Sequence, residues 1–228
     1  MSTVLITGSN RGLGLEFVRQ YATEGWKVIA TARDPDDPGA LAALARAHPN
    51  VQVEEFDALR DDSYTELARR VRGVPLDIVI NNAGVMTRRG FGGSSWADWE
   101  RHFRINSYAP MRLAESLVDA LALGTHKKFV ALTSLLGSIA ANQSGGLYAY
   151  RASKAAANAV LKSLAVDLAP RGITVLAMHP GWVKTDLGGV LAPLDATTSV
   201  TGMRAVIAAA TTADSGHFRQ WDGAEIAW

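Results

Sequence analysis

Short runs of apolar residues recur along the chain, and most of them are apolar at consecutive positions instead of alternating ones. Such runs are typical of strands in a parallel sheet that helices cover on both faces. The runs predict strands at Thr3–Thr7, Lys27–Ala32, Val51–Phe56, Leu76–Ile80, Lys128–Thr133 and Ile173–Met178.

Stretches with helical spacing lie between these strands. Apolar residues recur every three or four positions over Leu13–Ala22 and over Leu41–Ala45. The longest helical stretch runs from about Tyr148 to Ala169 and stops at Pro170, which cannot continue a helix. Strands that alternate with helices require right-handed crossovers. We therefore predict an α/β fold in which residues 1–228 form one domain, a doubly wound, Rossmann-like parallel sheet flanked by helices.

Composition narrows the class of protein further. The chain has 228 residues, of which 48% are hydrophobic and 20% charged, as is usual for a globular protein. Its net charge is +1, so no strong electrostatic field attracts nucleic acid or an anionic membrane. Without cysteine there are no disulfides, thiolate nucleophiles or zinc-thiolate sites. The five histidines have no paired spacing with a carboxylate, and we expect no metal site. The apolar run Val4–Ile6 leads straight into Thr7 and Gly8, so we expect no signal peptide and a cytoplasmic location.

Glycines follow the first predicted strand in the pattern T-G-x-x-x-G-x-G, from Thr7 to Gly14. Gly8 allows a tight turn, Gly12 lets the backbone approach a pyrophosphate, and Gly14 lets the helix pack closely on the strand. The first turn of that helix offers unpaired N–H groups to an anion. The pattern lacks the Lys-Ser/Thr pair of a phosphate-transfer loop, so it predicts dinucleotide binding and disfavours ATP or GTP hydrolysis.

Four further motifs follow in order: Asp57 after the third strand, Asn81-Asn82-Ala83-Gly84 after the fourth, Ser134 with Tyr150-Arg151-Ala152-Ser153-Lys154, and Pro180 to Thr185. With the glycine motif, they make the sequence resemble the short-chain dehydrogenase/reductase family over nearly the whole chain. The Tyr150 motif and the segment Asp222–Trp228 resemble its C-factor and carbonyl-reductase-like subgroup.

The resemblance implies a catalytic set of Asn106, Ser134, Tyr150 and Lys154. Tyr150 would exchange a proton with the substrate oxygen, although an unperturbed tyrosine has a pKa of about 10. Lys154, one helical turn away, would lower that pKa and hold the nicotinamide ribose. Ser134 would hold the carbonyl oxygen, and Asn106 would bind a water that links Lys154 to solvent.

The spacing of the serine departs from the family pattern. Ser134 precedes Tyr150 by 16 residues, and Ser138 is a competitor at 12. We prefer Ser134 because Thr133-Ser134-Leu135-Leu136-Gly137 resembles the family's strand end. The loop Ser144–Gly146 would accommodate the extra residues at little cost.

The end of the second strand should select the cofactor. An acidic residue there would bind the ribose 2′-hydroxyl of NAD, but the family register places Ala32 at that position and Arg33 next. Arg33 and Arg11 could clamp the 2′-phosphate of NADP, which we expect in preference to NAD. Asp34 would argue for NAD if the register shifted by two residues. The predicted cofactor-binding residues are Gly8, Ser9, Asn10, Arg11, Gly12, Leu13, Gly14, Arg33, Asp57, Ala58, Asn82, Ala83, Gly84, Tyr150, Lys154, Pro180, Gly181, Val183 and Thr185.

The function predicted from these motifs is hydride transfer between NADP(H) and a carbonyl or secondary alcohol. The alternative is a C-factor-like signalling or regulatory protein that binds the dinucleotide with weak or no turnover. We expect a small-molecule carbonyl substrate held by loops at about 85–95, 136–147 and 185–199, and no nucleic-acid or membrane partner. Homodimer, homotetramer and monomer stay open. Trp96 and Trp99, three residues apart, are expected in the core.

Overall fold

The computed structural model describes residues 1–37, 39–93 and 95–228, so residue 94 of the predicted substrate loop 85–95 lies outside the described residues. Seven strands of the described chain form one parallel sheet in the order β3-β2-β1-β4-β5-β6-β7. The strands are β1 (Thr3–Ile6), β2 (Lys27–Ala32), β3 (Val51–Glu55), β4 (Ile78–Asn81), β5 (Lys128–Leu132), β6 (Thr174–His179) and β7 (His217–Gln220). The prediction of a doubly wound parallel sheet is confirmed.

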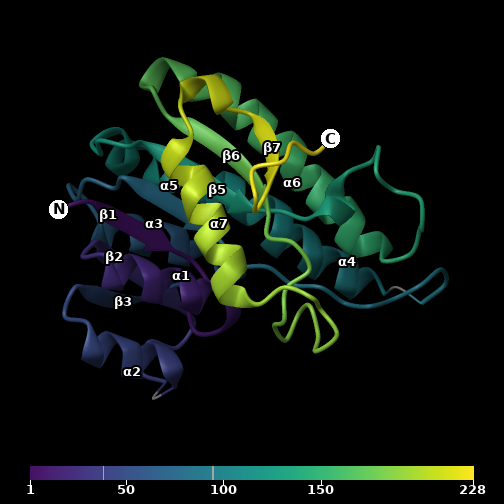
Figure 1. Cartoon of the computed structure of the whole chain (residues 1–228), viewed down its shortest axis with the longest axis horizontal. Coiled ribbons are helices and arrows are strands. Elements are labelled where there is room, and N and C mark those ends of the chain that lie inside the picture. Colours follow the sequence, from purple (N-terminus) through teal and green to yellow (C-terminus); the bar gives the residue numbers. More distant parts are fainter. Residues whose placement is uncertain (38, 94) are drawn as a thin grey trace.

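Helices cover both faces of the sheet (Figure 1). The helices are α1 (Gly12–Thr23), α2 (Ala40–Ala47), α3 (Asp61–Arg70), α4 (Trp96–His102), α5 (Ala109–Ala122), α6 (Tyr148–Asp167) and α7 (Ala196–Ala209). Short helical turns are η1 (Phe103–Tyr108), η2 (Leu135–Gly137), η3 (Ala169–Arg171) and η4 (Thr212–Asp214).

Two hydrophobic cores form because successive strand residues point to opposite faces of the sheet. Val4 and Ile6 pack with α1, α2 and α7, whereas Leu5, between them, packs with α3, α5 and α6. All three side chains have no exposed surface. The unbroken apolar runs therefore reflect a sheet that is buried on both sides.

The strand β7 is a difference from the sequence prediction, which gave six strands. It lies at the sheet edge beside β6, and only Phe218 of its four residues is fully buried. The neighbouring His217 and Arg219 are polar, so the segment carries too short an apolar run to predict a buried strand.

The helical segment from α4 to α5 contains one π-helical turn, η1. A π turn has i→i+5 hydrogen bonds, is rare, and frequently occurs at functional sites. It places Asn106 toward α6, where the side chain is 1% exposed. None of the helices that the structure describes has the length and apolarity to cross a bilayer.

Candidate active site

A cavity of about 530 Å³ lies at the carboxyl ends of the strands. This edge of a doubly wound sheet is where ligands bind. The predicted residues on its wall are Gly8, Asn10, Arg11, Gly12, Leu13, Arg33, Asp57, Ala58, Asn82, Ala83, Gly84, Tyr150, Lys154, Pro180 and Thr185. The structure does not place Ser9, Gly14, Asn106, Ser134, Gly181 or Val183 on this wall.

The turn after β1 requires its glycines. Gly8 has a φ of +67°, a left-handed conformation that favours glycine. At Gly14 a side-chain Cβ would lie 2.2 Å from the Gly8 carbonyl oxygen and 2.6 Å from Nδ2 of Asn82. Only a glycine at this position lets α1 start so close to the strand.

The turn is also tied to the end of β4. Asn82 Nδ2 donates to the carbonyl oxygens of Thr7 and Gly8 at 2.9 and 3.0 Å. The Thr7 hydroxyl accepts the backbone N–H groups of Asn82 and Ala83, both at 3.1 Å. These bonds explain why Asn82 accompanies the glycine motif, and they leave the Gly12 side of the turn open to the cavity.

The start of α1 fits an anionic group. No side chain caps the first turn of α1 among the described residues, so its N–H groups and the positive end of the helix dipole face outward. Gly12 presents only a hydrogen toward the cavity, where an added Cβ would come within 3.5 Å of Cγ2 of Thr185. Ser9 has a different role from the predicted ligand contact: it is fully buried, and its hydroxyl donates to the Ile6 carbonyl oxygen at 2.9 Å.

Tyr150 and Lys154 lie one turn apart on α6, and both are 5% exposed. Lys154 Nζ donates to the Leu132 carbonyl oxygen at the end of β5 at 2.7 Å. Burial lowers the pKa of Lys154 to about 8. Burial raises the pKa of Tyr150, and a hydrogen bond with Ser134 opposes that shift only in part. The expected lowering of the Tyr150 pKa by Lys154 is therefore not found for the chain's own groups.

The two competing serines have separate surroundings. Ser134 lies at the start of η2, where its Oγ accepts the N–H of Leu136 at 3.1 Å, and it is the side chain that acts against the rise in the pKa of Tyr150. Ser138 instead donates to the Ala227 carbonyl oxygen at 2.6 Å and accepts the N–H of Ala141 at 3.1 Å. Ser138 thus connects the segment after η2 to the last residues of the chain.

Asn106 uses its amide fully within the protein. Its Oδ1 accepts the N–H of Val85 at 2.9 Å, and its Nδ2 donates to the Val85 carbonyl oxygen and to Ser153 Oγ at 2.9 and 3.0 Å. A Cβ at Gly84 would lie 3.4 Å from Oδ1 of Asn106 and 3.6 Å from Nζ of Lys154. Asn106 therefore holds the strand end that lies beside the Lys154 ammonium.

Of the two arginines predicted to bind the 2′-phosphate of the cofactor, Arg33 is placed to do so and Arg11 is engaged elsewhere. Arg33 is exposed on the cavity wall. Asp34 does not line this cavity, and its Oδ1 accepts the N–H of Asp36 at 3.1 Å. Arg11 Nη1 forms an ion pair at 2.7 Å with Asp186, on the loop after β6, instead of pointing toward Arg33.

The loop after β6 is held in place by its own backbone. Gly181 has a φ of +84°, and a Cβ there would lie 2.8 Å from Cδ2 of Leu194. Val183 is buried and pairs with Leu194 in an isolated bridge. The Thr185 hydroxyl accepts the Gly188 N–H at 3.1 Å. Pro180, Lys184 and Thr185 are the residues of this motif that line the cavity.

Several residues near the site were not predicted from the sequence. The cavity wall also includes Phe56, Leu59, Val85, Arg101, Ile105, Lys184 and Leu187. His102 is 1% exposed, accepts the Thr87 N–H on Nε2 at 3.0 Å, and has its ring 6.3 Å from that of Tyr150. Four of them had a sequence signal: Leu59 follows Asp57 and Ala58, Lys184 belongs to the motif Pro180 to Thr185, and Val85 and Leu187 lie in predicted substrate loops. No cluster of three metal-ligating side chains occurs among the described residues.

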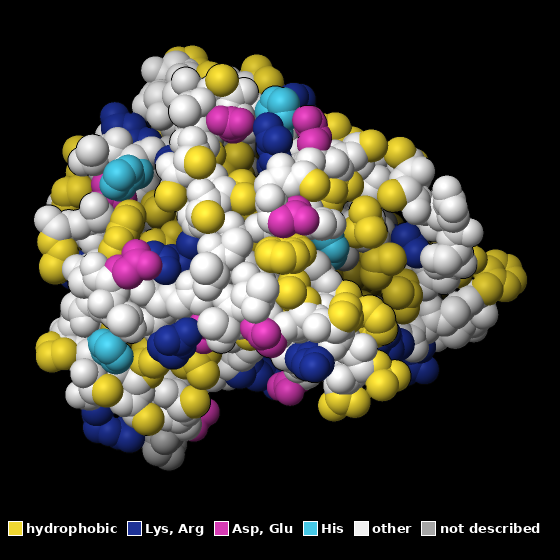
Figure 2. Space-filling model, in the orientation of Figure 1, with side chains coloured by type: hydrophobic (Ala, Val, Ile, Leu, Met, Phe, Trp, Pro, Cys, Tyr) yellow, Lys and Arg dark blue, Asp and Glu magenta, His cyan; other side chains and the backbone are white. Residues whose placement is uncertain are grey.

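Large apolar side chains are exposed on the loops around the cavity. Figure 2 shows hydrophobic side chains gathered on the right-hand part of the face it presents. The exposed apolar residues of these loops and of α4 are Phe91, Trp96, Leu135, Ile139, Trp182, Leu187, Val190 and Leu191. Trp96 is 85% exposed, so its predicted place in the core is wrong, whereas Trp99 is partly buried and stacks on Phe103.

The structure thus combines a doubly wound parallel sheet with a helix that carries Tyr150 and Lys154 at the carboxyl edge of the sheet. Comparison with known proteins shows to which protein family the chain belongs. The family described as short chain dehydrogenase matches residues 2–193, and the chain belongs to it. This membership and the carbonyl-reductase-like resemblance expected from the motifs are confirmed.

Three similar proteins place the chain within that family. The C-signal protein of Myxococcus xanthus is 43% identical over 155 residues, which cover 68% of this chain and 93% of that protein. The carbonyl reductase Sniffer of D. melanogaster superposes with a TM-score of 0.94 at 34% identity, covering 100% of both chains. An NADPH-bound carbonyl reductase from chicken fatty liver gives a TM-score of 0.93 at 32% identity, covering 100% of this chain and 99% of that one.

Proposed function

We propose that this protein reduces a small carbonyl compound with NADPH, with Tyr150 as the proton donor. The observation that carries the proposal is the meeting of Tyr150, Ser134 and Lys154 beside a cavity that begins at a glycine cradle. The similarity to carbonyl reductases, one of them NADPH-bound, supports the same activity.

The cavity would hold the cofactor along its length. The pyrophosphate would lie on Gly12 and the first turn of α1, and the adenine beside Asp57 and Ala58. Arg33 would bind the 2′-phosphate by charge-assisted hydrogen bonds. The nicotinamide half would lie toward Tyr150, near Asn82, Ala83, Gly84 and Lys154 on one side and Pro180 and Thr185 on the other. NADPH, when bound, would supply the hydride.

Tyr150 suits the role of an acid in reduction. Because burial raises its pKa, the phenol keeps its proton at neutral pH. It would donate that proton to the carbonyl oxygen as negative charge develops there. The Ser134 hydroxyl accepts the Leu136 N–H, and its own O–H can then donate to the same oxygen.

Lys154 would support this proton transfer from the other side. Its Nζ uses one N–H on the Leu132 carbonyl oxygen and has two further hydrogens for ribose hydroxyls. A positive charge here would lower the cost of forming the phenolate. Asn106 would keep Val85 and Gly84 in place beside that ammonium.

The test compares wild type with Tyr150→Phe in NADPH oxidation with aromatic ketones, quinones and aliphatic aldehydes. We expect the variant to lose at least about 100-fold in kcat/KM, because a general acid contributes about that much or more. Its affinity for NADPH should stay within about threefold of wild type, since the ring remains. Unchanged turnover in Tyr150→Phe would remove Tyr150 from the mechanism.

The C-signal relative favours a second candidate, a signalling protein that binds the dinucleotide without turnover. The same experiment separates the two candidates. Tight NADPH binding with no oxidation of NADPH by any of these carbonyl classes would favour the signalling protein.

A further inference from the structure

Four consecutive residues after β3, Phe56–Leu59, line the cavity on the wall that also holds Arg33. Their backbone forms a closed turn: the Leu59 N–H donates to Asp57 Oδ1, and the Asp57 N–H donates to Ser63 Oγ, both at 2.9 Å. The Leu59 carbonyl oxygen takes no part in this turn. Its partner comes from a distant part of the chain.

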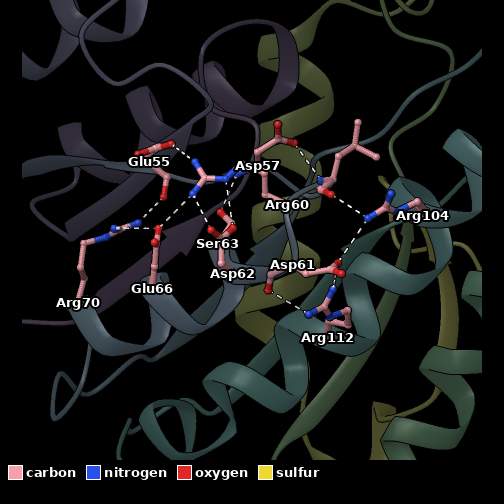
Figure 3. A network of polar contacts seen from close by, with 11 residues as sticks. Glu55, Asp57, Arg60, Asp61, Asp62, Ser63, Glu66, Arg70, Arg104 and Arg112 are labelled. Carbon is pink, nitrogen blue, oxygen red and sulfur yellow. Dashed lines mark hydrogen bonds and ion pairs between the residues drawn. The ribbon is translucent and has the colours of Figure 1, made fainter.

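That partner is Arg104, on the π turn η1 (Figure 3). Arg104 Nη2 donates to the Leu59 carbonyl oxygen at 2.8 Å and lies 3.4 Å from Asp61 Oδ1. The Asp61 side chain is 74% exposed, so this ion pair alone contributes little. Asp57 and Ala58 of this wall are held from within α3, by Ser63 Oγ and by the Tyr64 hydroxyl, which donates to the Ala58 carbonyl oxygen at 2.9 Å. The bond from Arg104 is the contact that holds the partly buried Leu59 carbonyl.

A second arginine shares Asp61 but does not touch Leu59. Arg112, on α5, donates to Oδ1 and to the backbone oxygen of Asp61, and its guanidinium lies 4.4 Å from the Tyr64 ring centroid. Figure 3 shows that both Arg104 and Arg112 point toward Asp61. Both arginines therefore place a positive charge beside the Asp61 carboxylate, but of the two only Arg104 bonds to Leu59 on the cavity wall.

Arg104 also lies two residues before Asn106. The Asn106 side chain binds Val85 and Ser153, next to Lys154, whereas the Arg104 side chain reaches the opposite way to Leu59. One turn of helix thus holds both the strand end beside the proposed nicotinamide site and the wall beside the proposed adenine site.

We propose that Arg104 is a positioning residue that holds the Asp57–Leu59 turn in the shape that accepts the adenine end of the cofactor. This inference rests on the proposed function, because it takes the cavity to be the NADPH site. Without the guanidinium, the Leu59 carbonyl would bond to water and the turn would gain conformational freedom, which must be lost again when the adenine binds. Binding of the adenine half should weaken, and binding of the nicotinamide half should not.

The experiment measures dissociation constants of full-length wild type, Arg104→Ala, Arg104→Lys and Arg112→Ala for NADPH, adenosine 2′,5′-bisphosphate and nicotinamide mononucleotide. We expect Arg104→Ala to bind the bisphosphate and NADPH about tenfold more weakly, the cost of ordering the freed turn again when the ligand binds. The mononucleotide should bind within about twofold of wild type. Arg104→Lys, which can still donate to Leu59, should recover most of the affinity.

Arg112→Ala is the matched control, because it removes the same charge from Asp61 and leaves Leu59 untouched. It should lower the thermal stability yet keep bisphosphate binding within about twofold of wild type. Hydrogen exchange at the Leu59 amide should accelerate in Arg104→Ala and stay unchanged in Arg112→Ala.

Three results would overturn the inference: unchanged bisphosphate binding in Arg104→Ala, an equal loss in Arg112→Ala, or an equal loss for the mononucleotide. In each of these cases wild type still binds NADPH, and the proposed function stands. If folded wild type binds neither NADPH nor the bisphosphate, the proposed function itself is wrong, and this inference is wrong with it.

Discussion

Ser134 and Ser138, two buried serines in the segment after β5, have different roles. Ser134 influences the pKa of Tyr150, and Ser138 bonds with Ala227 and Ala141. We predict that Ser134→Ala lowers kcat/KM for carbonyl reduction about 100-fold, the effect of losing one donor to a developing oxyanion. Its cost in stability should be smaller than that of Ser138→Ala, because it leaves one backbone group, the Leu136 N–H, without a partner. Ser138→Ala should instead cost about 1–2 kcal/mol of unfolding free energy, because it leaves two backbone groups without a partner. Steady-state kinetics and urea unfolding of both variants test this prediction. A larger loss of activity in Ser138→Ala than in Ser134→Ala would contradict it.

The buried ammonium of Lys154 makes stability depend on pH in alkaline solution. Its pKa is about 8 in the folded chain and near 10.5 in the unfolded chain, so the unfolded chain binds more protons between these values. The unfolding free energy of wild type should therefore rise with pH through this window, and below about pH 8 this group adds no further change.

The matched variant is Lys154→Met, which lacks the titrating group. We expect the unfolding free energy of wild type, relative to this variant, to rise by about 2 kcal/mol between pH 7 and 9.5. Denaturant unfolding at four pH values measures it. A difference that stays flat over this range would mean that Lys154 titrates at its ordinary pKa in the fold.

The sequence places Tyr150 and Lys154 together but does not reveal that burial raises the Tyr150 pKa in the chain without cofactor. The spacing of four residues is a local property of a helix, so the sequence suffices for it. The pKa depends on burial by distant segments, and the side chain proves to be 5% exposed. The prediction that Trp96 is buried was wrong for a related reason. Its spacing to Trp99 predicts that the two side chains share a helix face, but it does not reveal whether another element covers that face.

Among the structural elements, the turn into α1 is the one least tolerant of change. In Gly14→Ala, the new methyl group would overlap the Gly8 carbonyl and the Asn82 amide. We predict a loss of about 3 kcal/mol in unfolding free energy, as for other overpacked sites, together with weaker NADPH binding. Gly90→Ala is the control, since nothing lies within 4 Å of the added Cβ and the backbone there is not left-handed. Calorimetric unfolding of both variants tests this, and equal stabilities would show that the helix can move away from the strand.

The elements themselves were largely predictable, because most of the six predicted strands are apolar runs that both helical layers bury. The exceptions lacked a local signal. The strand β7 pairs at an edge through backbone bonds and buries little besides Phe218. The π turn depends on how Asn106 packs against Val85 and Ser153, a contact between distant segments that periodicity cannot reveal.

For the molecule as a whole, cofactor binding should raise the free energy of unfolding. A ligand that binds only the folded chain at 100 times its dissociation constant adds about 2.7 kcal/mol. For a chain of this size that is a rise of roughly 5–10 °C in Tm. We predict this rise with NADPH and a smaller one with NADH at equal concentration, because Arg33 lies exposed at the cavity wall and Asp34 does not.

Arg33→Ala provides the internal control for that preference. It should weaken NADPH binding about tenfold, the loss of a charge-assisted contact, and change NADH binding less than twofold. Differential scanning fluorimetry with both cofactors measures the pair of shifts. Equal shifts in wild type would mean that the protein does not distinguish the two cofactors.

The π turn that joins α4 to α5 carries a final consequence for how this chain tolerates length changes. An α-helix advances about 100° per residue. Shortening η1 by one residue would restore regular α-helical bonding, yet it would swing α4 by that angle around the common axis. The His102 ring would then leave the Thr87 amide, and Arg104 would leave Leu59. A one-codon deletion here should therefore be far more harmful than one in the exposed Gly145–Gly146 loop, even though both remove a single residue.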